Sequence, residues 1–418
     1  MRDLASIATI EKTWALEGKD RVVGASMVEN AYECMVSKDI QPGQLVAFIQ
    51  EGAILPVCDT WEWLRKRCYR ENVNGFVIKP QKFGCIKSWG LIVPLTDLGL
   101  EGKVVSKLKA GDDITDLLGI RKYEPEEDAS PKGDSKKSYP KWVKFCLSHS
   151  LTRWIGRIWQ AKHQNVAGGF PSDVISKSDE TTVQNKKDVI TRFADDLVYT
   201  SCKIEGQSFT ALFDYKNGKV GKFYVCSRNS AYRKPSDTVL FWTVAKRLDV
   251  ENKLAKFYKD TGKLLVIQGE QVGPGIQQNI YDLPVNDWYV YTIKDEITGK
   301  QLPLDEMVSA CETLGLKTVP IIEKNVKLSS IMPDVDTAVT YAENKFWVPT
   351  KDGFEPFYTE KKGKLWVDYF QHEGVVVRSM NYDKDSNVGV SFKVKNLAYA
   401  EQDLGKTHNA CVAVKSKL

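Results

Sequence analysis

The 418-residue chain lacks the features of a zinc-binding, disulfide-stabilised or membrane-spanning protein. It has nine cysteines and four histidines but no C-x-x-C pair, so neighbouring residues cannot supply the ligands of a zinc site. An odd number of single cysteines is typical of reduced, mostly buried thiols. No apolar run approaches the length of a membrane span, and the first residues contain no apolar signal core. We therefore expect a soluble, cytoplasmic protein without membrane contact.

Charge of neither sign dominates the sequence. Lys and Arg number 59 against 54 Asp and Glu, which gives a net charge of +5. This mild excess permits a polyanionic partner but does not identify one. Hydrophobic residues make up 42% of the chain, enough for packed cores, and the length predicts two or three domains.

The composition changes twice along the chain. Residues 1–122 contain short apolar runs broken by Gly and Pro, which predicts a small β-barrel, with an oligonucleotide-binding (OB) barrel as one candidate. Residues 123–167 combine a charged linker with a Trp-rich amphipathic helix at 141–164, which could lie on RNA or on a membrane surface, or dock against a domain. Residues 168–418 mix strands with helical stretches at 238–260 and 305–314, typical of an α+β domain.

Lys203 ends a predicted strand and begins the sequence Lys203-Ile204-Glu205-Gly206. A glycine turn after a strand places the amine at the mouth of a sheet. K-x-x-G by itself is a weak signal, because a surface hairpin gives the same letters. A nucleophilic lysine must lose a proton near neutral pH, and burial and nearby cations would lower its pKa.

Two further lysines alternate in the predicted strand VSFKVKN. Lys393 and Lys395 should point to one side of the strand and Phe392 and Val394 to the other. The two ammonium groups could lie in water or in a cleft. In a cleft they would bind phosphate and repel the proton of a neighbouring lysine.

Carboxylates and aromatic rings accompany three other apolar strands. Glu373 precedes the strand GVVVR, where a carboxylate could hold a divalent metal. Glu270 closes the strand LLVIQG and leads into the loop VGPGIQQN, a place that suits a ribose hydroxyl. Tyr289 and Tyr291 share one face of a strand, where a ring could stack on a purine. Each of these positions also has a purely structural explanation.

Taken in order, these motifs resemble those of the covalent nucleotidyltransferases, which comprise ATP-dependent DNA and RNA ligases and mRNA capping enzymes. KSDETTVQN, KIEG, CSRN, QGEQVGPGIQQN, WYVYTI, EGVVVR and SFKVKN are most similar to the RNA ligase family typified by the Deinococcus radiodurans and Naegleria enzymes. The N-terminal KPQKFGCIKSWGLIVPL and LGIRKYEP extend the resemblance over nearly the whole chain. It implies an α+β protein with an N-terminal OB-like module and a C-terminal nucleotidyltransferase domain of antiparallel sheets and helices.

The resemblance implies a nucleotide site built around Lys203. This lysine would attack the α-phosphate of ATP, with Glu205 and Gly206 beside it. Glu270 would bind the ribose hydroxyl, and one of the two tyrosines would stack on adenine. The family usually has aspartate where this chain has Glu205.

The remaining motif residues would act on phosphates and on RNA. Arg228 would contact phosphate or the nucleic-acid end, Glu373 would organise Mg²⁺ or Mn²⁺, and Lys393 and Lys395 would clamp phosphate. The implied reaction adenylylates the lysine, transfers AMP to an RNA 5′-phosphate, and joins that end to a 3′-hydroxyl. The implied partners are RNA ends or a nicked duplex with an RNA 3′-hydroxyl strand, bound by a monomer.

Two alternatives remain beside an RNA ligase. One is a DNA or mixed-specificity nick ligase, which the N-terminal module and the short sequence after Lys395 disfavour, because DNA ligases and capping enzymes carry a C-terminal OB domain. The other is a catalytically silent nucleic-acid-binding factor. A silent factor has no need for the complete set of lysines and carboxylates, so finding the whole set favours activity.

Overall fold

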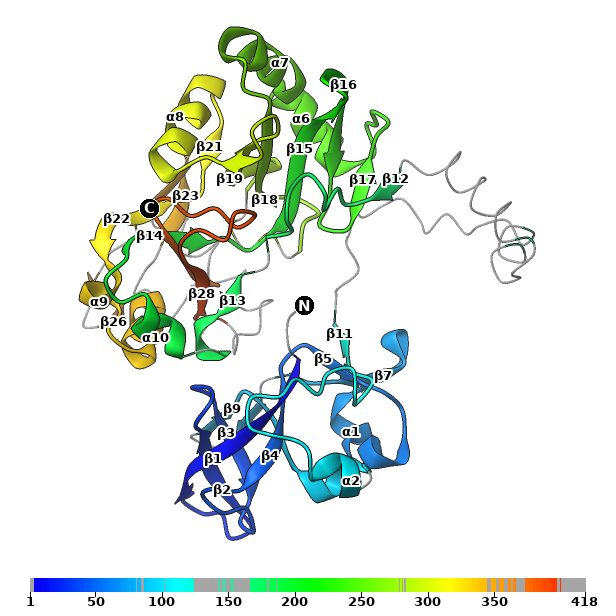
Figure 1. Ribbon diagram of the computed structural model, residues 1–418, viewed down its shortest axis with the longest axis vertical. Helices are drawn as coiled ribbons and strands as arrows, with labels where there is room; N and C mark the ends of the chain where they lie inside the picture. The colour runs from blue at the N-terminus through cyan, green and yellow to red at the C-terminus, as the bar shows by residue number, and fades with distance from the viewer. Residues whose placement is uncertain are drawn as a thin grey trace. The chain divides into compact units, whose positions relative to one another are not determined.

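The computed structural model describes residues 4–79, 81–83, 86–100, 102–123, 142, 146, 152, 166–178, 180–185, 187–277, 279, 281, 283–343, 347–350, 353–356, 360–361, 364–365, 373–396 and 399. The chain divides into two compact units (Figure 1). The first comprises Met1–Glu126, Thr181–Ala194 and Ser329–Val339, and the second comprises Glu127–Glu180, Asp195–Leu328 and Thr340–Leu418. The predicted Trp-rich helix lies outside the described residues except at positions 142, 146 and 152.

A nearly closed sheet forms the first part of the first unit. Its strands follow the order β10 (Gly90–Pro94), β4 (Leu45–Gln50), β1 (Ala5–Ala15), β2 (Val22–Met27) and β3 (Glu33–Ser37). The Trp89 N–H donates to the Glu33 carbonyl over 3.3 Å, and the Met35 N–H donates to the Ser88 hydroxyl over 3.2 Å. These bonds join the region of β10 to β3 at the opposite edge. The sheet is thus barrel-like, as the sequence predicts.

A second sheet of this unit has the order β11 (Arg121–Lys122), β5 (Ala53–Leu55), β7 (Gly75–Val77) and β6 (Tyr69–Arg70). It shares an apolar core with β1 and β4 that includes Ile7, Ile49, Trp61 and Phe76. The unit's other elements include the 3-10 turns η1 (Asp59–Leu64), η2 (Glu71–Val73), η3 (Leu95–Leu98) and η4 (Val183–Asn185), the helices α1 (Arg65–Cys68), α2 (Gly102–Val105) and α5 (Asp188–Arg192), and the strands β8 (Gln81–Phe83), β9 (Ile86–Ser88) and β13 (Thr181–Thr182).

The large sheet of the second unit has the order β12 (Val166–Gly169), β17 (Ser230–Tyr232), β16 (Lys219–Cys226), β15 (Gln207–Lys216), β18 (Leu265–Val272), β19 (Asp287–Asp295) and β20 (Lys300–Gln301), with β21 (Lys317–Thr318) paired to β19. Helices α6 (Leu240–Arg247), α7 (Val250–Thr261) and α8 (Leu304–Leu314) cover one face and share its core (Figure 1). The helical stretch predicted at 238–260 is two helices, because Asp249 between them adopts a left-handed φ of 53°.

Another sheet of the second unit contains β28 (Ser391–Lys395), β27 (Gly374–Ser379), β14 (Leu197–Lys203) and β22 (Ile321–Lys327) in that order. Two hairpins pair β23 (Trp347–Thr350) with β24 (Gly353–Pro356) and β25 (Glu360–Lys361) with β26 (Lys364–Leu365). Helices α9 (Leu328–Ile331) and α10 (Val335–Glu343) follow β22 along the chain. The strands with interspersed helices confirm an α+β fold. Within the described ranges, no helix is long and apolar enough to span a membrane.

Candidate active site

The Lys203 segment forms the strand, turn and strand that the sequence predicts. Strand β14 ends at Lys203 and β15 begins at Gln207. The Glu205 N–H donates to the Tyr281 hydroxyl over 2.8 Å, and the Gln277 side-chain amide donates to the Gly206 carbonyl over 2.5 Å. The segment that follows Glu270 along the chain therefore holds the turn that follows the lysine.

Gly206 allows β18 to approach this turn closely. A Cβ at this position would lie 2.4 Å from the Gln271 carbonyl oxygen and 2.8 Å from the Glu270 Cγ. Only glycine lacks the atom that would force the two segments apart. This close approach brings Glu270 beside the turn. Glu270 lies within β18 rather than at its end, since the strand continues to Val272.

The pairing of β14, β27 and β28 brings three motifs to one end of the sheet that these strands share. Lys203 on β14 pairs with Gly374 on β27, and Gly374 pairs with Lys395 on β28. Lys393 lies two residues before Lys395 on β28, opposite Val376. The side chains of Phe392 and Val394 are fully buried, whereas the two lysines are half-buried. The predicted alternation along β28 is thus confirmed.

Gly374 is required where the three strands meet. Its φ of +145° disfavours other residues, and a Cβ there would lie 2.1 Å from the Val394 carbonyl oxygen. The preceding residue, Glu373, accepts the Asn396 N–H at its carbonyl over 3.1 Å. The start of β27 is therefore fixed to the end of β28, and Glu373 is held at the same end of the sheet as Lys203.

The Lys203 ammonium forms an ion pair with Glu373. Their side chains are 26% and 29% exposed, so the pair is shielded but reachable from solvent. Burial lowers the pKa of Lys203, but the negative charges of Glu373, Glu270 and Glu205 outweigh burial and hold this pKa above its ordinary value. The expectation of a lowered pKa is wrong for this arrangement, because carboxylates rather than cations dominate the immediate surroundings of the amine.

Two of these carboxyl groups resist ionisation. Burial and the charge of Glu373 raise the pKa of Glu270 to about 8, against the opposing charges of Lys203 and Arg228. Burial raises the pKa of Glu205 to about 7. Neither Glu205 oxygen has a hydrogen-bond partner among the described residues, although the nearby Tyr399 hydroxyl offsets part of the rise. Strongly perturbed carboxyl groups around one amine are typical of a functional site.

The two predicted tyrosines both lie beside Glu270 but differ in their surroundings. Tyr289 pairs directly with Glu270 across β18 and β19, and its ring is buried in an apolar cluster with Ile204 and Tyr281. Tyr291 is only half-buried. Its hydroxyl forms hydrogen bonds with two serine hydroxyls, at 2.8 and 3.1 Å. Tyr291 is therefore the more accessible ring of the two.

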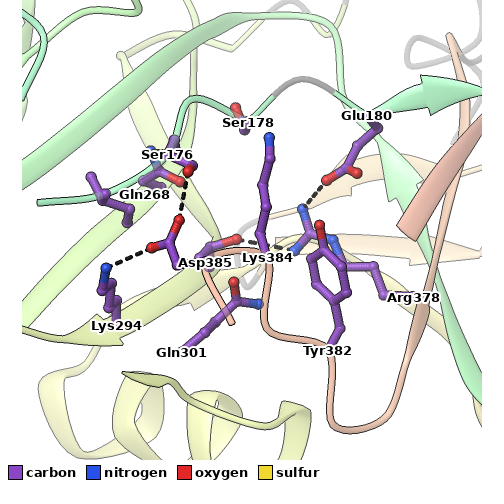
Figure 2. Close-up of a pocket in the computed structure, with 12 residues that line it drawn as sticks. Ser176, Ser178, Glu180, Gln268, Lys294, Gln301, Arg378, Tyr382, Lys384 and Asp385 are labelled. Carbon is purple, nitrogen blue, oxygen red and sulfur yellow. Dashed lines mark hydrogen bonds and ion pairs between the residues drawn. The ribbon is translucent and has the colours of Figure 1, made fainter. Parts of the chain in front are cut away.

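The hairpin of β27 and β28 carries a second set of charged residues that sequence analysis did not assign. Arg378 donates to a Glu180 oxygen over 2.6 Å (Figure 2). It also donates to the Tyr291 carbonyl over 2.6 Å. The Ser391 hydroxyl donates to the other Glu180 oxygen. Although burial opposes ionisation, the Arg378 charge and the Ser391 hydroxyl hold the pKa of Glu180 below its ordinary value. These contacts join β27 and β28 to β19 of the large sheet.

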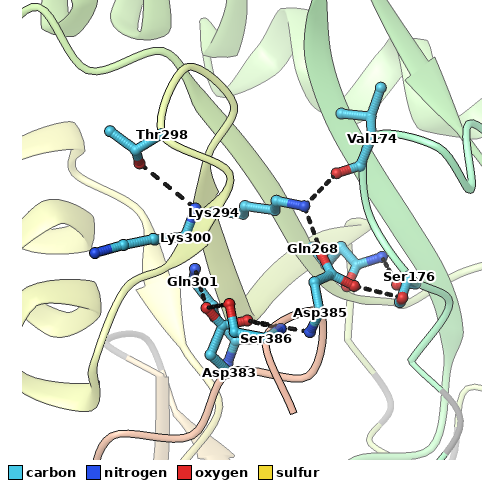
Figure 3. Close-up of polar contacts among 10 residues, drawn as sticks. All are labelled: Val174, Ser176, Gln268, Lys294, Thr298, Lys300, Gln301, Asp383, Asp385 and Ser386. Atoms are coloured by element: carbon cyan, nitrogen blue, oxygen red, sulfur yellow. Dashed lines mark hydrogen bonds and ion pairs between the residues drawn. The ribbon is translucent and has the colours of Figure 1, made fainter. Parts of the chain in front are cut away.

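A second ion pair holds the turn of the same hairpin. Lys294 on β19 donates to Asp385 over 2.5 Å and to the Val174 carbonyl over 2.6 Å, and Ser176 donates to Asp385 over 2.5 Å (Figure 3). The Asp383 side chain accepts the Ser386 hydroxyl and closes the turn. Both ion pairs line a small pocket that is surrounded mainly by polar side chains (Figure 2). They fasten the hairpin that carries Glu373, Lys393 and Lys395.

The RNA ligase family model matches residues 196–395, a segment that runs from β14 through the end of β28. It contains Lys203, Glu270, Glu373 and both lysines of β28. The resemblance to the RNA ligase family is confirmed.

Solved structures extend the similarity to the whole fold. A mutant of the Naegleria gruberi RNA ligase with AMP and Mn has a TM-score of 0.71 and 22% identity, over 96% of this chain and 98% of that one. A second mutant of that ligase with ATP and Mn has a TM-score of 0.70 and 21% identity, over 98% of each chain. The same ligase with PPi has a TM-score of 0.71 and 21% identity, over 96% of this chain and 99% of that one. At this identity the likeness shows a shared fold. No curated protein matches the chain.

The carboxylates of this RNA ligase fold suit a hard divalent cation only in part. In the described part of the chain, no group of three or more His, Cys, Asp or Glu side chains is arranged to hold a metal ion. A cation at Glu373 would therefore need phosphate oxygens and water as further ligands, which is how Mg²⁺ commonly binds. The donor chemistry fits such an ion once a polyphosphate is present.

Proposed function

We propose that this protein is an ATP-dependent RNA ligase that joins an RNA 3′-hydroxyl to a 5′-phosphate through an AMP group carried on Lys203. The observation that carries the proposal is the convergence of Lys203 on β14, Glu270 on β18, Lys395 on β28 and Glu373, which directly precedes β27. The family match over these strands supports the same activity. The solved relatives were studied with ATP, AMP and Mn, which supports ATP and a divalent metal as the ligands.

In the first step, the neutral Lys203 amine forms a bond to the α-phosphorus as the bond to pyrophosphate breaks. The Lys203 ammonium reaches this neutral form by giving a proton to its paired Glu373, and the second proton leaves the nitrogen for water or the departing pyrophosphate as the P–N bond forms. A bound Mg²⁺ or Mn²⁺ would neutralise charge on the phosphates. The ammonium groups of Lys393 and Lys395 would oppose the charge that builds on the leaving group. Displacement at phosphorus depends mainly on such positioning and neutralisation.

The other site residues bind the nucleoside and the RNA end. Glu270, next to Gly206, accepts a ribose hydroxyl, and the half-buried Tyr291 offers the ring for adenine. Arg228 lies close enough to affect the pKa of Glu270, a position from which it contacts phosphate or the RNA end. In the later steps AMP passes to the RNA 5′-phosphate, and the 3′-hydroxyl of the second end then expels it.

We further propose a three-part organisation for this activity. Residues 1–122 form an OB-like module, residues 123–167 a linker with a Trp-rich helix, and residues 168–418 the nucleotidyltransferase domain. The protein would act as a cytoplasmic monomer on RNA ends or on a nicked duplex with an RNA 3′-hydroxyl strand.

Lys203→Ala separates the steps of this reaction. The variant should lose all sealing of RNA that carries an ordinary 5′-phosphate. It should still join RNA supplied with a 5′-adenylyl group, because the last step does not use the amine. Sealing of both RNAs is measured on denaturing gels, with circular dichroism to establish folding. A folded variant that seals 5′-phosphate RNA, or that fails on adenylylated RNA, would contradict the assignment of Lys203.

A further inference from the structure

The turn after Lys203, residues Ile204–Gly206, lies outside both of the strands that it joins. Its residues Ile204 and Glu205 are buried. A buried backbone N–H needs an acceptor, and here the acceptor comes from a distant segment, because the Glu205 N–H donates to the Tyr281 hydroxyl over 2.8 Å. This side-chain bond replaces the strand pairing that stops on either side of the turn.

Tyr281 itself is held in place from two sides. Its ring is 1% exposed and packs in an apolar cluster that includes Ile204. The Asn279 side chain donates to the Leu283 carbonyl over 3.1 Å and accepts the Leu283 N–H over 3.2 Å, which joins the chain before Tyr281 to the chain after it. The hydroxyl that binds Glu205 therefore has a fixed position, and its ring is too deeply buried to touch a bound nucleotide.

The same segment holds the next residue of the turn. The Gln277 side-chain amide donates to the Gly206 carbonyl over 2.5 Å, from an exposed residue. Gly206 also lies against β18, where an added Cβ would be 2.4 Å from the Gln271 carbonyl oxygen. The turn is therefore held by β18 and by the side chains of Gln277 and Tyr281, so that it can rotate only if these contacts break.

The orientation of this turn sets the position of two site residues. Lys203 directly precedes the turn, and its amine is paired with Glu373. Glu205 is a turn residue, and its charge acts on the same amine. Displacement at phosphorus requires the nucleophile to lie in line with the leaving group. A shift of about 1 Å at such a site can slow a reaction about 100-fold.

We propose that Tyr281 and Gln277 are positioning residues for the displacement of pyrophosphate from ATP by the Lys203 amine. They hold the turn and thereby the direction of the amine. The inference rests on the proposed RNA ligase function. It assigns both residues a role in the step that uses the amine as a nucleophile, and none in the final joining of an adenylylated RNA end, which does not use the amine. A purely structural role would affect both steps alike.

Tyr281→Phe tests the proposal, because it removes the hydroxyl and keeps the ring. Single-turnover formation of lysyl-AMP is measured with full-length protein over a range of ATP concentrations. The maximal rate should fall about 10- to 100-fold. The ATP concentration at half-maximal rate should stay within about threefold of wild type, because the buried residue does not touch ATP. Sealing of RNA that already carries a 5′-adenylyl group, measured without ATP, should also stay within about threefold.

Gln277→Ala is a second test that does not disturb the core, because the residue is exposed. It should slow lysyl-AMP formation about 3- to 10-fold and spare the sealing of adenylylated RNA in the same way. Should Tyr281→Phe fail to fold by thermal unfolding, Gln277→Ala decides alone, and a wild-type rate of lysyl-AMP formation for it would overturn the proposal.

Matched controls lie in the same unit. Tyr224→Phe removes the hydroxyl of another buried tyrosine, which belongs to a different apolar cluster. Lys259→Ala truncates an exposed side chain on α7. Both controls should form lysyl-AMP within about twofold of the wild-type rate, as substitutions away from the site usually do.

The outcomes separate this inference from the proposed function. The inference alone is overturned if wild type forms lysyl-AMP and Tyr281→Phe forms it equally fast, or loses only affinity for ATP. It is also overturned if sealing of adenylylated RNA falls as much as lysyl-AMP formation, since that result indicates a general loss of structure. If wild type forms no lysyl-AMP, the proposed function fails and the inference fails with it.

Discussion

Two groups of charged side chains lie at the two ends of the β27–β28 hairpin, one around Arg378 and one around Lys203. The carboxyl groups in the two groups are partnered in opposite ways. At the Arg378 end, Glu180 and Asp385 each have a basic partner and a hydroxyl donor, and the pKa values of both lie below their ordinary range. At the Lys203 end, three carboxyl groups surround one amine, and the pKa values of Glu205 and Glu270 rise to about 7 and 8.

This difference separates the charged groups that stabilise the fold from those of the proposed active site. The ion pairs of Arg378 and Lys294 hold the hairpin against the large sheet at one end. The fold therefore tolerates carboxyl groups with raised pKa values at the other end. In the proposed function, a nucleotide, its metal and RNA would supply further partners to the carboxyl groups around Lys203.

The largest stability effect is expected at the satisfied end. Glu180→Ala should lower the free energy of unfolding by about 3–5 kcal/mol, because the Arg378 guanidinium would stay buried without its counter-charge. Urea unfolding measures the change. Glu180→Gln, which keeps an acceptor, should cost less. A loss below about 1 kcal/mol for Glu180→Ala would show that this pair does not hold the hairpin.

Glu270→Gln should have the reverse effect on stability at the unsatisfied end. The folded pKa of Glu270, about 8, lies above its unfolded value, so its contribution is fully favourable below pH 4 and is lost as pH rises through 8. The variant should therefore be more stable than wild type at pH 9 and equal to it at pH 4.

The same Glu270→Gln variant should form lysyl-AMP about 10- to 100-fold more slowly, because an amide replaces the carboxyl group that accepts the ribose hydroxyl. Thermal unfolding across pH and single-turnover adenylylation provide the two measurements. A variant that is less stable than wild type at pH 9 would place Glu270 with the structural carboxylates instead.

A smaller effect is expected on the pH dependence of Glu373→Gln. Glu373 is the charge that contributes most to raising the pKa of Lys203, so its removal should shift the rise of the adenylylation rate to lower pH. The maximal rate should also fall if Glu373 holds the metal. The rate is measured against pH for wild type and variant at saturating ATP and metal. An unchanged profile would mean that another group sets the ionisation of the lysine.

Sequence patterns predicted the local parts of this site. Strand alternation placed Lys393 and Lys395 on one face, and the glycine turn after Lys203 followed from the sequence. Contacts between distant segments could not be predicted. Arg378 stands in the string EGVVVR, but its partner Glu180 is 198 residues away in the sequence. The negative surroundings of Lys203 also arise from register and close packing, which a single sequence does not reveal.

Incubation of the purified protein with ATP labelled at the α-phosphate and a divalent metal, followed by a denaturing gel, tests the central claim most directly. The account predicts a labelled band at the protein's mass for wild type and none for Lys203→Ala. Prior removal of bound AMP ensures that unlabelled adduct does not hide the reaction. No label on wild type after that treatment, or equal label on Lys203→Ala, would contradict covalent catalysis at Lys203.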